Sequence, residues 1–213
     1  MTNKELEKRI AELEKQVAKL CEPRVCNASP NWRNLSEMDW GEIVEDAKQG
    51  REFGIDEYKE LELYSGEVCK AHILQTYPEQ GKVAMFFTID GEFEMNETAT
   101  NKGGWGGSKM YNTYVPRYEK MLPEDLKKHI EKTNCDGVES LLWLMDYNDV
   151  CNYNDKFDYF KKGGKISDKS DWWWLHSPNT NSSTHFWNVT SSGNDSSISA
   201  NISYGVCFAF ILS

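Results

Sequence analysis

The carboxylates between residues 146 and 158 are the first group in the sequence that could carry chemistry. Asp146, Asp149, Asp155 and Asp158 fall in one polar stretch, and carboxylate oxygens are ligands that calcium prefers. Their spacing does not follow the alternating Asp/Asn pattern, with its fixed glycine, of the EF-hand calcium loop. We therefore predict no metal site, and a structural calcium ion is the open alternative.

The cysteines and histidines show no arrangement typical of a metal or redox site. No two cysteines are separated by only two residues, and the four histidines lack zinc spacing. The chain is long enough to build a core without disulfides. We therefore expect reduced thiols, no catalytic residue and no cofactor. The cysteines are Cys21, Cys26, Cys69, Cys135, Cys151 and Cys207.

A glycine-rich segment at residues 101–107, Asn-Lys-Gly-Gly-Trp-Gly-Gly, could suggest a phosphate-binding loop. The glycine spacing is wrong for that loop, and no Gly-Lys-Ser/Thr follows. The segment is better explained as a Trp-centred turn that leads into a helical stretch over 108–120.

The stretch from Asp171 to Leu212 organises the rest of the chain. It begins with the run Trp172-Trp173-Trp174-Leu175 and ends with an apolar run over 206–212. Between these runs, 16 of the 26 residues at 179–204 are Asn, Ser or Thr. Two apolar runs of strand length are typical of a buried sheet. We therefore predict ordered loops and edge strands displayed by a rigid core.

The composition of this tract has a genetic pattern. An Asn codon has the form AAY, and replacing one of its adenines gives codons for Ser, Thr, Ile, Asp, His or Tyr. Apart from Phe186, Trp187, Val189, Gly193 and one alanine, the tract contains only Asn and these residue types. The alternative is an ordinary surface loop rich in Ser and Asn.

The N-terminal segment over residues 3–22 has apolar residues at alternating spacings of four and three, which is a heptad pattern. We predict a short coiled-coil helix over 1–22 that drives self-association, followed by a linker over 23–31. The alternative is an amphipathic helix packed on the domain. The predicted oligomerisation residues are Leu6, Ile10, Leu13, Val17 and Leu20.

The remaining elements predict an α+β domain over 32–213. Ser36 is expected to cap a helix whose inner face holds Trp40, Ile43, Val44 and Ala47, and Gly50 is expected to end it. A further helix is expected to begin at Pro123, and 146–170 is expected to be a long polar loop. The strand candidates are Tyr58–Tyr64, Val68–Tyr77, Lys82–Ile89 and Ser140–Met145.

Charge and hydropathy exclude several classes of protein. A net charge of −10 disfavours nucleic acid and anionic membrane surfaces. No apolar stretch reaches the roughly 18 residues of a membrane span, and the N-terminus lacks a signal-peptide core. We expect synthesis in the cytoplasm without a signal peptide, and placement on a phage particle or a cell surface if the protein is exported by another route.

The tract and its flanking runs resemble the variable proteins of diversity-generating retroelements, in which a reverse transcriptase randomises adenines of a template repeat. The residues that carry this resemblance are "WWWLHSPN", the tract with "FWNV", and "GVCFAFIL". Motif order over 32–213 is similar to the C-type-lectin fold, in the branch of formylglycine-generating-enzyme-like proteins. His176 is a departure, because relatives usually have Arg there, and we therefore expect it to face the binding surface.

The resemblance implies a non-enzymatic protein that binds a protein or glycan on a target cell through a variable region at about 172–212, encoded by a phage or a bacterium. The alternative is an enzyme of the formylglycine-generating type, although the C-terminal region has only Cys207 where such enzymes use a cysteine pair. The ligand-binding residues implied are Trp173, His176, Asn179, Thr180, Asn181, Ser182, Ser183, Thr184, His185, Trp187, Asn188, Thr190, Ser192, Asn194, Asp195, Ser196, Ser197, Ile198, Ser199, Asn201, Ile202 and Tyr204.

Overall fold

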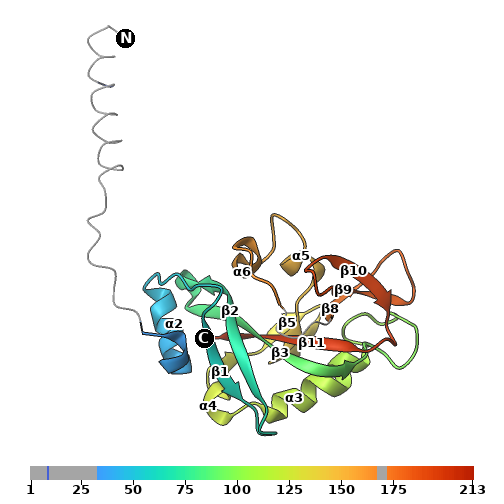
Figure 1. The fold of residues 1–213 in the computed structure, drawn as a ribbon, viewed down its shortest axis with the longest axis horizontal. Helices are drawn as coiled ribbons and strands as arrows, with labels where there is room; N and C mark the ends of the chain where they lie inside the picture. Colours follow the sequence, from blue (N-terminus) through green and yellow to red (C-terminus); the bar gives the residue numbers. More distant parts are fainter. Residues whose placement is uncertain (1–8, 10–32, 167–171) are drawn as a thin grey trace. The chain divides into compact units, whose positions relative to one another are not determined.

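The computed structural model describes residues 9, 33–166 and 172–213. Residues 33–213 form one compact unit with an α+β architecture built around a large sheet (Figure 1). The predicted coiled coil, with its five heptad residues, lies outside the described residues. None of the helices in the described parts of the chain is long and apolar enough to span a membrane.

The main sheet has the strand order β1-β2-β3-β11-β8-β9-β10. The four strands β1, β2, β3 and β11 pair antiparallel, and β11 meets β8 in parallel through Gly205 and Trp173. β4 and β7 also pair with β11, and β5 with β6 forms a separate hairpin. The strands are β1 (Tyr58–Glu62), β2 (Val68–Tyr77), β3 (Lys82–Phe93), β4 (Ile130–Glu131), β5 (Thr133–Cys135), β6 (Val138–Ser140), β7 (Trp143–Leu144), β8 (Trp173–Pro178), β9 (His185–Val189), β10 (Asp195–Ser199) and β11 (Tyr204–Leu212).

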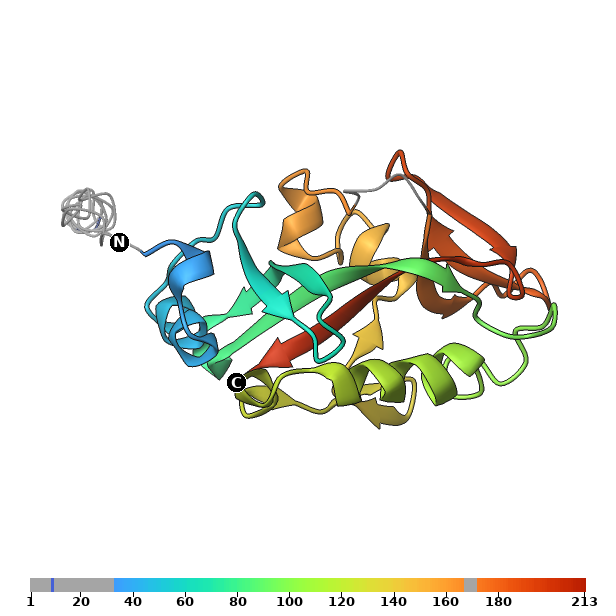
Figure 2. The same cartoon turned by 60° about the horizontal axis from the view of Figure 1, so that its bottom comes forward.

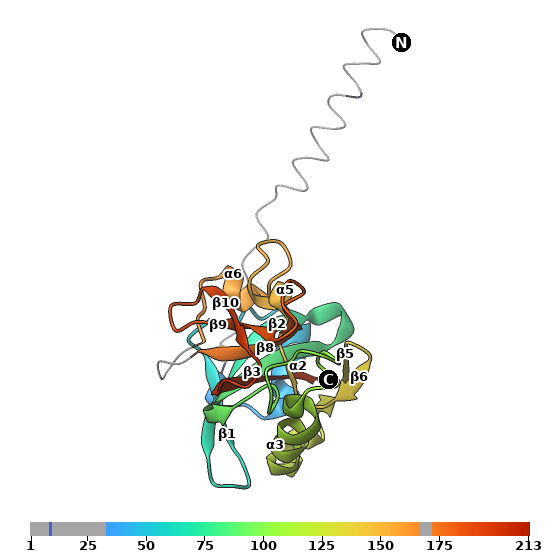
Figure 3. The same ribbon diagram turned by 90° about the vertical axis from the view of Figure 1, so that its right-hand side faces the viewer.

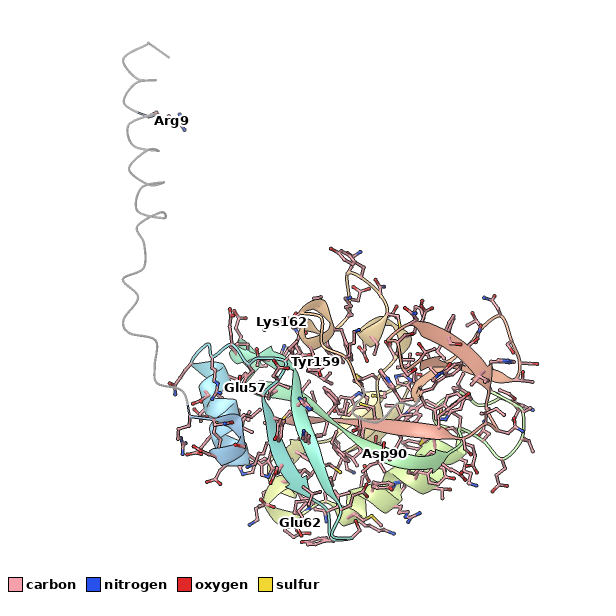
Figure 4. All side chains as sticks on the ribbon, in the orientation of Figure 1. Arg9, Glu57, Glu62, Asp90, Tyr159 and Lys162 are labelled. Atoms are coloured by element: carbon pink, nitrogen blue, oxygen red, sulfur yellow. The ribbon has the colours of Figure 1, made fainter. Side chains whose placement is uncertain are left out.

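Helices cover both faces of the sheet (Figure 2). On one face, Trp40 of α2 and Tyr118 of α3 contact Phe210 and Phe208 of β11, with ring centroids 6.2 and 5.1 Å apart. On the other face, Tyr159 of α6 contacts Phe86 of β3 at 5.0 Å (Figure 4). The helical segments are η1 (Leu35–Glu37), α2 (Trp40–Lys48), η2 (Pro78–Gln80), η3 (Met110–Tyr114), α3 (Val115–Met121), α4 (Glu124–Lys127), α5 (Tyr147–Val150) and α6 (Asp158–Lys161).

This double covering explains why the last strand is an uninterrupted apolar run. Phe208, Ala209 and Phe210 of β11 are all fully buried, because neighbouring side chains point to opposite faces and both faces are packed. Replacing Phe208 or Phe210 by alanine is therefore expected to lower the free energy of unfolding by about 3–5 kcal/mol.

The first long helix begins three residues later than predicted. Asp39 is the N-cap of α2, and Glu42 accepts a hydrogen bond from its N–H at 2.8 Å. Ser36 lies instead in the short turn η1, whose cap is Asn34. The predicted inner face of α2 is buried, and Gly50, with φ +82°, follows its end in the left-handed conformation that favours glycine.

Between residues 101 and 170 the predictions hold in part. Segment 101–107 forms turns that lead into a π-helical turn, η3, and then α3, as expected. The expected strand over 140–145 is split between β6 and β7. The expected polar loop over 146–170 contains the short helices α5 and α6. Asp146 caps α5 by accepting a hydrogen bond from the Asp149 N–H at 2.7 Å.

Candidate functional site

The polar tract forms a hairpin beside β8. Strands β9 and β10 pair antiparallel, with Trp187 opposite Ser197, and β9 pairs with β8. Figure 3 shows β8, β9 and β10 side by side. The flanking runs are buried, with Trp174 and Cys207 fully inaccessible. The prediction of edge strands and loops displayed by a buried core is therefore confirmed.

The exposed residues of the tract lie at both ends of the hairpin. At one end, Ala200 N–H donates to Thr184 O at 2.9 Å and brings the loops over 179–184 and 200–203 together. The loop over 190–194 lies at the opposite end. The exposed polar residues of the tract are Thr180, Asn181, Ser183, Ser191, Ser192, Asn194, Asp195, Asn201 and Ser203.

Three of the predicted surface residues are buried. Trp173 is 4% exposed, His176 is 6% exposed and Asn188 is inaccessible. In β8, Trp173 points toward α6, where its ring stacks on Phe160 at 6.5 Å. These positions cannot contact a ligand directly, because packed elements cover both faces of the sheet there.

The two isoleucines of the tract differ from each other. Ile202 is 39% exposed, as predicted. Ile198 is only half-buried and packs against the core from β10. Of these two implied ligand-binding residues, Ile202 is therefore accessible to a ligand, whereas the strand position of Ile198 turns it toward apolar neighbours.

Many polar side chains of the tract form hydrogen bonds with other residues of the tract, so they are not all free to project outward. Asn179 donates from Nδ2 to Ser197 Oγ at 2.8 Å and joins the first loop to β10. Thr190 Oγ1 accepts from Asn194 N–H at 3.2 Å and closes the second loop. Short polar side chains commonly fold back on nearby backbone in this way. The other bonded groups include Ser182 with Thr184 and His185, Thr190 with Ser192, Asn194 with Ser192, and Ser199 with Asn201.

Asn101 holds the first loop and was not singled out by the sequence. Its Nδ2 donates to the carbonyl oxygens of Asn179, Ser182 and His185 at 3.2, 2.6 and 2.9 Å. Its N–H also donates to Ser183 O at 3.0 Å. The glycine-rich turn therefore positions the loop over 179–185, and an Asn beside clustered glycines was its only local signal.

Two aromatic pairs flank the hairpin. The ring centroid of Trp187 lies 4.6 Å from that of Tyr147 in α5. The ring of Tyr204 stacks on that of Trp172, with centroids 5.3 Å apart. Trp187 and Tyr204 are each half-buried. Each ring therefore keeps part of its surface accessible while its neighbour holds it in place.

His176 belongs to the interior beneath the hairpin. Its Nδ1 lies 3.3 Å from Asp136 Oδ2, and its ring lies 5.6 Å from Trp105. Burial lowers the pKa of His176, and the nearby Asp136 carboxylate opposes this shift. The expectation that His176 faces a ligand is wrong.

The predicted carboxylate group has a structural role at its first two members. Asp146 and Asp149 cap α5 by accepting from each other's N–H groups at 2.9 and 2.7 Å. Burial, and then the charge of Asp146, raise the pKa of Asp149 to about 6. Within the described residues, no three His, Cys, Asp or Glu side chains come together as metal ligands would.

The fold and this surface define a class of protein, an α+β domain that presents a polar hairpin on an aromatic core. The chain belongs to the family described as Domain of unknown function (DUF6273), whose model matches residues 88–213. The match includes the whole polar tract and the glycine-rich turn that holds it. No curated protein matches the chain. No solved structure matches it either.

Proposed function

We propose that the protein is a diversified ligand-binding protein with a C-type-lectin scaffold, whose variable region at about 172–212 recognises a protein or glycan on a target cell. A phage or bacterial origin fits this role. The proposal is non-enzymatic and requires no cofactor.

The observation that carries the proposal is the separation of exposure in the tract from burial in its flanking runs. Apart from Gly193, the loops at 180–183, 191–195 and 201–203 contain only Asn and residue types one adenine change away from it, and all of their residues except the half-buried Ser182 are exposed. The apolar runs on either side of the tract supply buried strands of the core. Loops on a rigid scaffold can change sequence and binding while the core retains stability.

The half-buried aromatic residues could supply contact energy that short polar side chains lack. Binding hot spots favour Trp and Tyr, which add large contact area at a low entropy cost. Trp187 and Tyr204 are already held by ring contacts. The polar loops around them would then decide which ligand fits.

An enzyme of the formylglycine-generating type has less support. Cys207 is inaccessible in β11, and burial raises the pKa of its thiol well above the ordinary value. A reactive cysteine must be accessible and must be present as the thiolate. The burial and the raised pKa of Cys207 meet neither requirement.

The proposal is tested most directly in the DNA beside the gene. We expect a near-identical repeat of the codons for 172–212 near a reverse-transcriptase gene, with mismatches confined to adenines. Absence of such a repeat, or mismatches spread over all four bases, would contradict diversification.

The coiled coil over 1–22 would multiply weak contacts through avidity. We expect deletion of these residues to lower the oligomeric order and leave the domain folded, because the heptad pattern supplies the association. Light scattering with circular dichroism measures both. A full-length monomer at micromolar concentration would contradict this part of the proposal.

A further inference from the structure

Strand β10 is an open edge of the main sheet. It is the last strand in the sheet order and pairs only with β9 among the described strands. Thr190 N–H donates to Asn194 O at 2.8 Å, and Ala200 N–H donates to Thr184 O at 2.9 Å. Residues 194 and 200 therefore bond toward β9. Because an antiparallel strand alternates its bonding direction, the backbone groups of Asp195, Ser197 and Ser199 point away from it.

The outward groups form a short pairing ladder. None of the N–H groups of Asp195, Ser197 and Ser199 has a hydrogen-bond partner elsewhere in the described chain. Of their carbonyls, only that of Ser199 is used, by Ile202 N–H at 3.0 Å. Such alternating donors and acceptors are what an added strand requires.

The opposite edge of the sheet carries more blocking features than β10 does within the described residues. β1 carries Lys59, Glu60 and Glu62, and Figure 4 labels Glu62 on this strand. Lys59 Nζ donates a hydrogen bond to Met38 O at 2.5 Å. Charged side chains and covering contacts are common ways to block edge pairing. β10, Asp-Ser-Ser-Ile-Ser, has no lysine or proline, and its register with β9 runs without a bulge.

The side chains beside this edge favour a basic partner. Trp187 lies directly opposite Ser197, and Tyr147 donates from its hydroxyl to Asp195 Oδ2 at 3.2 Å. The small serine leaves the Trp187 and Tyr147 rings within reach of a long side chain on an added strand. An arginine there could lie on these rings and approach Asp195.

A second acid lies near this end of β10. Burial, followed by the charge of Asp195, raises the pKa of the Cys151 thiol to about 11, the positive charge of Lys156 opposes this shift, and Asp146 adds a smaller contribution to it. Asp195 is therefore the main acid here, and Lys156 offsets part of its charge. The chain as a whole is acidic, with a net charge of −10, which would attract a basic segment at long range.

We propose that β10 binds an extended basic peptide segment of the partner protein as an added β-strand, with an Arg or Lys side chain over Trp187. This inference rests on the proposed function and deepens it, because it assigns a ligand class to the same surface. Backbone pairing would supply a constant part of the affinity, and the polar loops at both ends of the hairpin would select among sequences.

The test uses the full chain and a displayed library of random linear peptides. Selected peptides are expected to be basic. Ser197→Pro removes the outward N–H and leaves the β9 ladder in place, so it should weaken their binding about tenfold or more. Ser197→Ala is the matched control, because it loses the same hydroxyl bond to Asn179 and keeps the N–H. N-methylation of the peptide backbone should abolish binding only at alternate residues, those whose N–H groups face β10.

A measurement on the unmodified chain keeps the inference testable if Ser197→Pro does not fold. Amide exchange of Ser197 and Ser199 should slow when a selected peptide binds, while Ser196 and Ile198, already bonded to β9, should change little. Failure to select basic peptides, equal binding to the Pro and Ala variants, or unchanged exchange at Ser197 would each overturn the proposal.

The same peptides separate this inference from the proposed function. If Ser197→Pro leaves peptide binding intact while substitution of Asn181, Ser183 and Asn201 abolishes it, the peptide binds to the loops and not to the β10 edge. If Ser197→Pro abolishes binding while the loop substitutions leave it intact, β10 is a peptide site and the proposal that the loops recognise the ligand is wrong.

Discussion

Asn188 has an environment that a polar side chain seldom occupies. It is inaccessible in β9, and neither its Oδ1 nor its Nδ2 has a hydrogen-bond partner within the described residues. An unpaired buried amide loses its hydration without compensation, which costs about 1–3 kcal/mol. An Asn that packing does not favour is consistent with a position supplied by diversification rather than selected for stability.

We expect Asn188→Val to raise the free energy of unfolding by about 1–3 kcal/mol, because it removes both unpaired groups and suits a strand. Chemical denaturation measures the change. Asn181→Val is the exposed control and should shift stability by about 0.5 kcal/mol or less. A destabilised Asn188→Val would indicate that the amide is hydrated or needed for packing.

Asp149 gives the protein a specific dependence on pH. Its pKa is about 6 in the folded protein, raised by burial and by Asp146 from an ordinary value of 3.8. Between these two values the folded chain holds a proton that the unfolded chain releases. Stability contributed by this group is therefore present below about pH 4 and is lost as the pH rises through 6.

We expect Asp149→Asn to raise the free energy of unfolding above that of the wild type at pH 7, and to do so by up to about 2 kcal/mol more than at pH 4. This figure is reduced to allow for the partial exposure of Asp149. Asn can still accept the Asp146 N–H, so the cap is retained. His176, whose pKa is lowered, acts in the opposite direction in both proteins, and so the difference isolates Asp149. Denaturation curves at both pH values provide the measurement. Parallel pH profiles for variant and wild type would contradict the assigned pKa.

At the scale of elements, the glycine-rich turn and the loop over 179–185 are joined as one unit. Asn101 alone makes four hydrogen bonds to main-chain oxygens of residues 179–185. Asn96 strengthens the same junction, since its N–H donates to Ala200 O at 2.9 Å and its Oδ1 accepts from Lys109 N–H at 3.0 Å. The loop is therefore held from outside the tract, which allows its own exposed side chains to vary.

We expect Asn101→Ala to lower the free energy of unfolding by about 1–3 kcal/mol, because three buried or half-buried carbonyls lose their donor. Amide exchange over 179–185 should also accelerate locally. Asn181→Ala, in the loop itself, should do neither. If Asn101→Ala leaves exchange in the loop unchanged, the loop is held mainly by its own hydrogen bonds.

Local pattern predicts the sheet better than the surface it displays. The continuous apolar runs that form β8 and β11 are easily recognised because both faces of these strands are buried. Burial of Asn188 could not be predicted, because a tract of Asn, Ser and Thr has no apolar alternation to mark its inner face. The Asn101 contacts join residues 78 to 84 positions apart, so no local pattern contains them. Ser36 and Asp39 are both good cap residues by type, so the sequence alone does not decide between them; in the structure Asp39 forms the capping box with Glu42.

At the scale of the molecule, the tract contains two kinds of exposed or half-exposed polar residue. One kind has side chains without hydrogen bonds to other described residues, and the other joins the loops to their strands. Only the first kind can vary freely without a stability cost. The free set includes Asn181, Ser183, Ser191 and Ser203, and the bonded set includes Asn179, Ser182, Thr190 and Asn194.

We expect simultaneous replacement of the four free residues by alanine to change the free energy of unfolding by about 1 kcal/mol or less, because exposed substitutions have small and nearly additive effects. Replacement of the four bonded residues should cost about 3 kcal/mol or more, at roughly 1 kcal/mol for each hydrogen bond lost. The two variants each change four side chains of the tract, and both sets include residues of the loops over 179–184 and 190–194, so each controls for the other. Urea denaturation of both, with binding of a selected peptide measured in parallel, separates stability from recognition. Equal losses of stability would mean that the tract is a uniform structural element, and a diversified surface could not then tolerate exchange at its exposed positions.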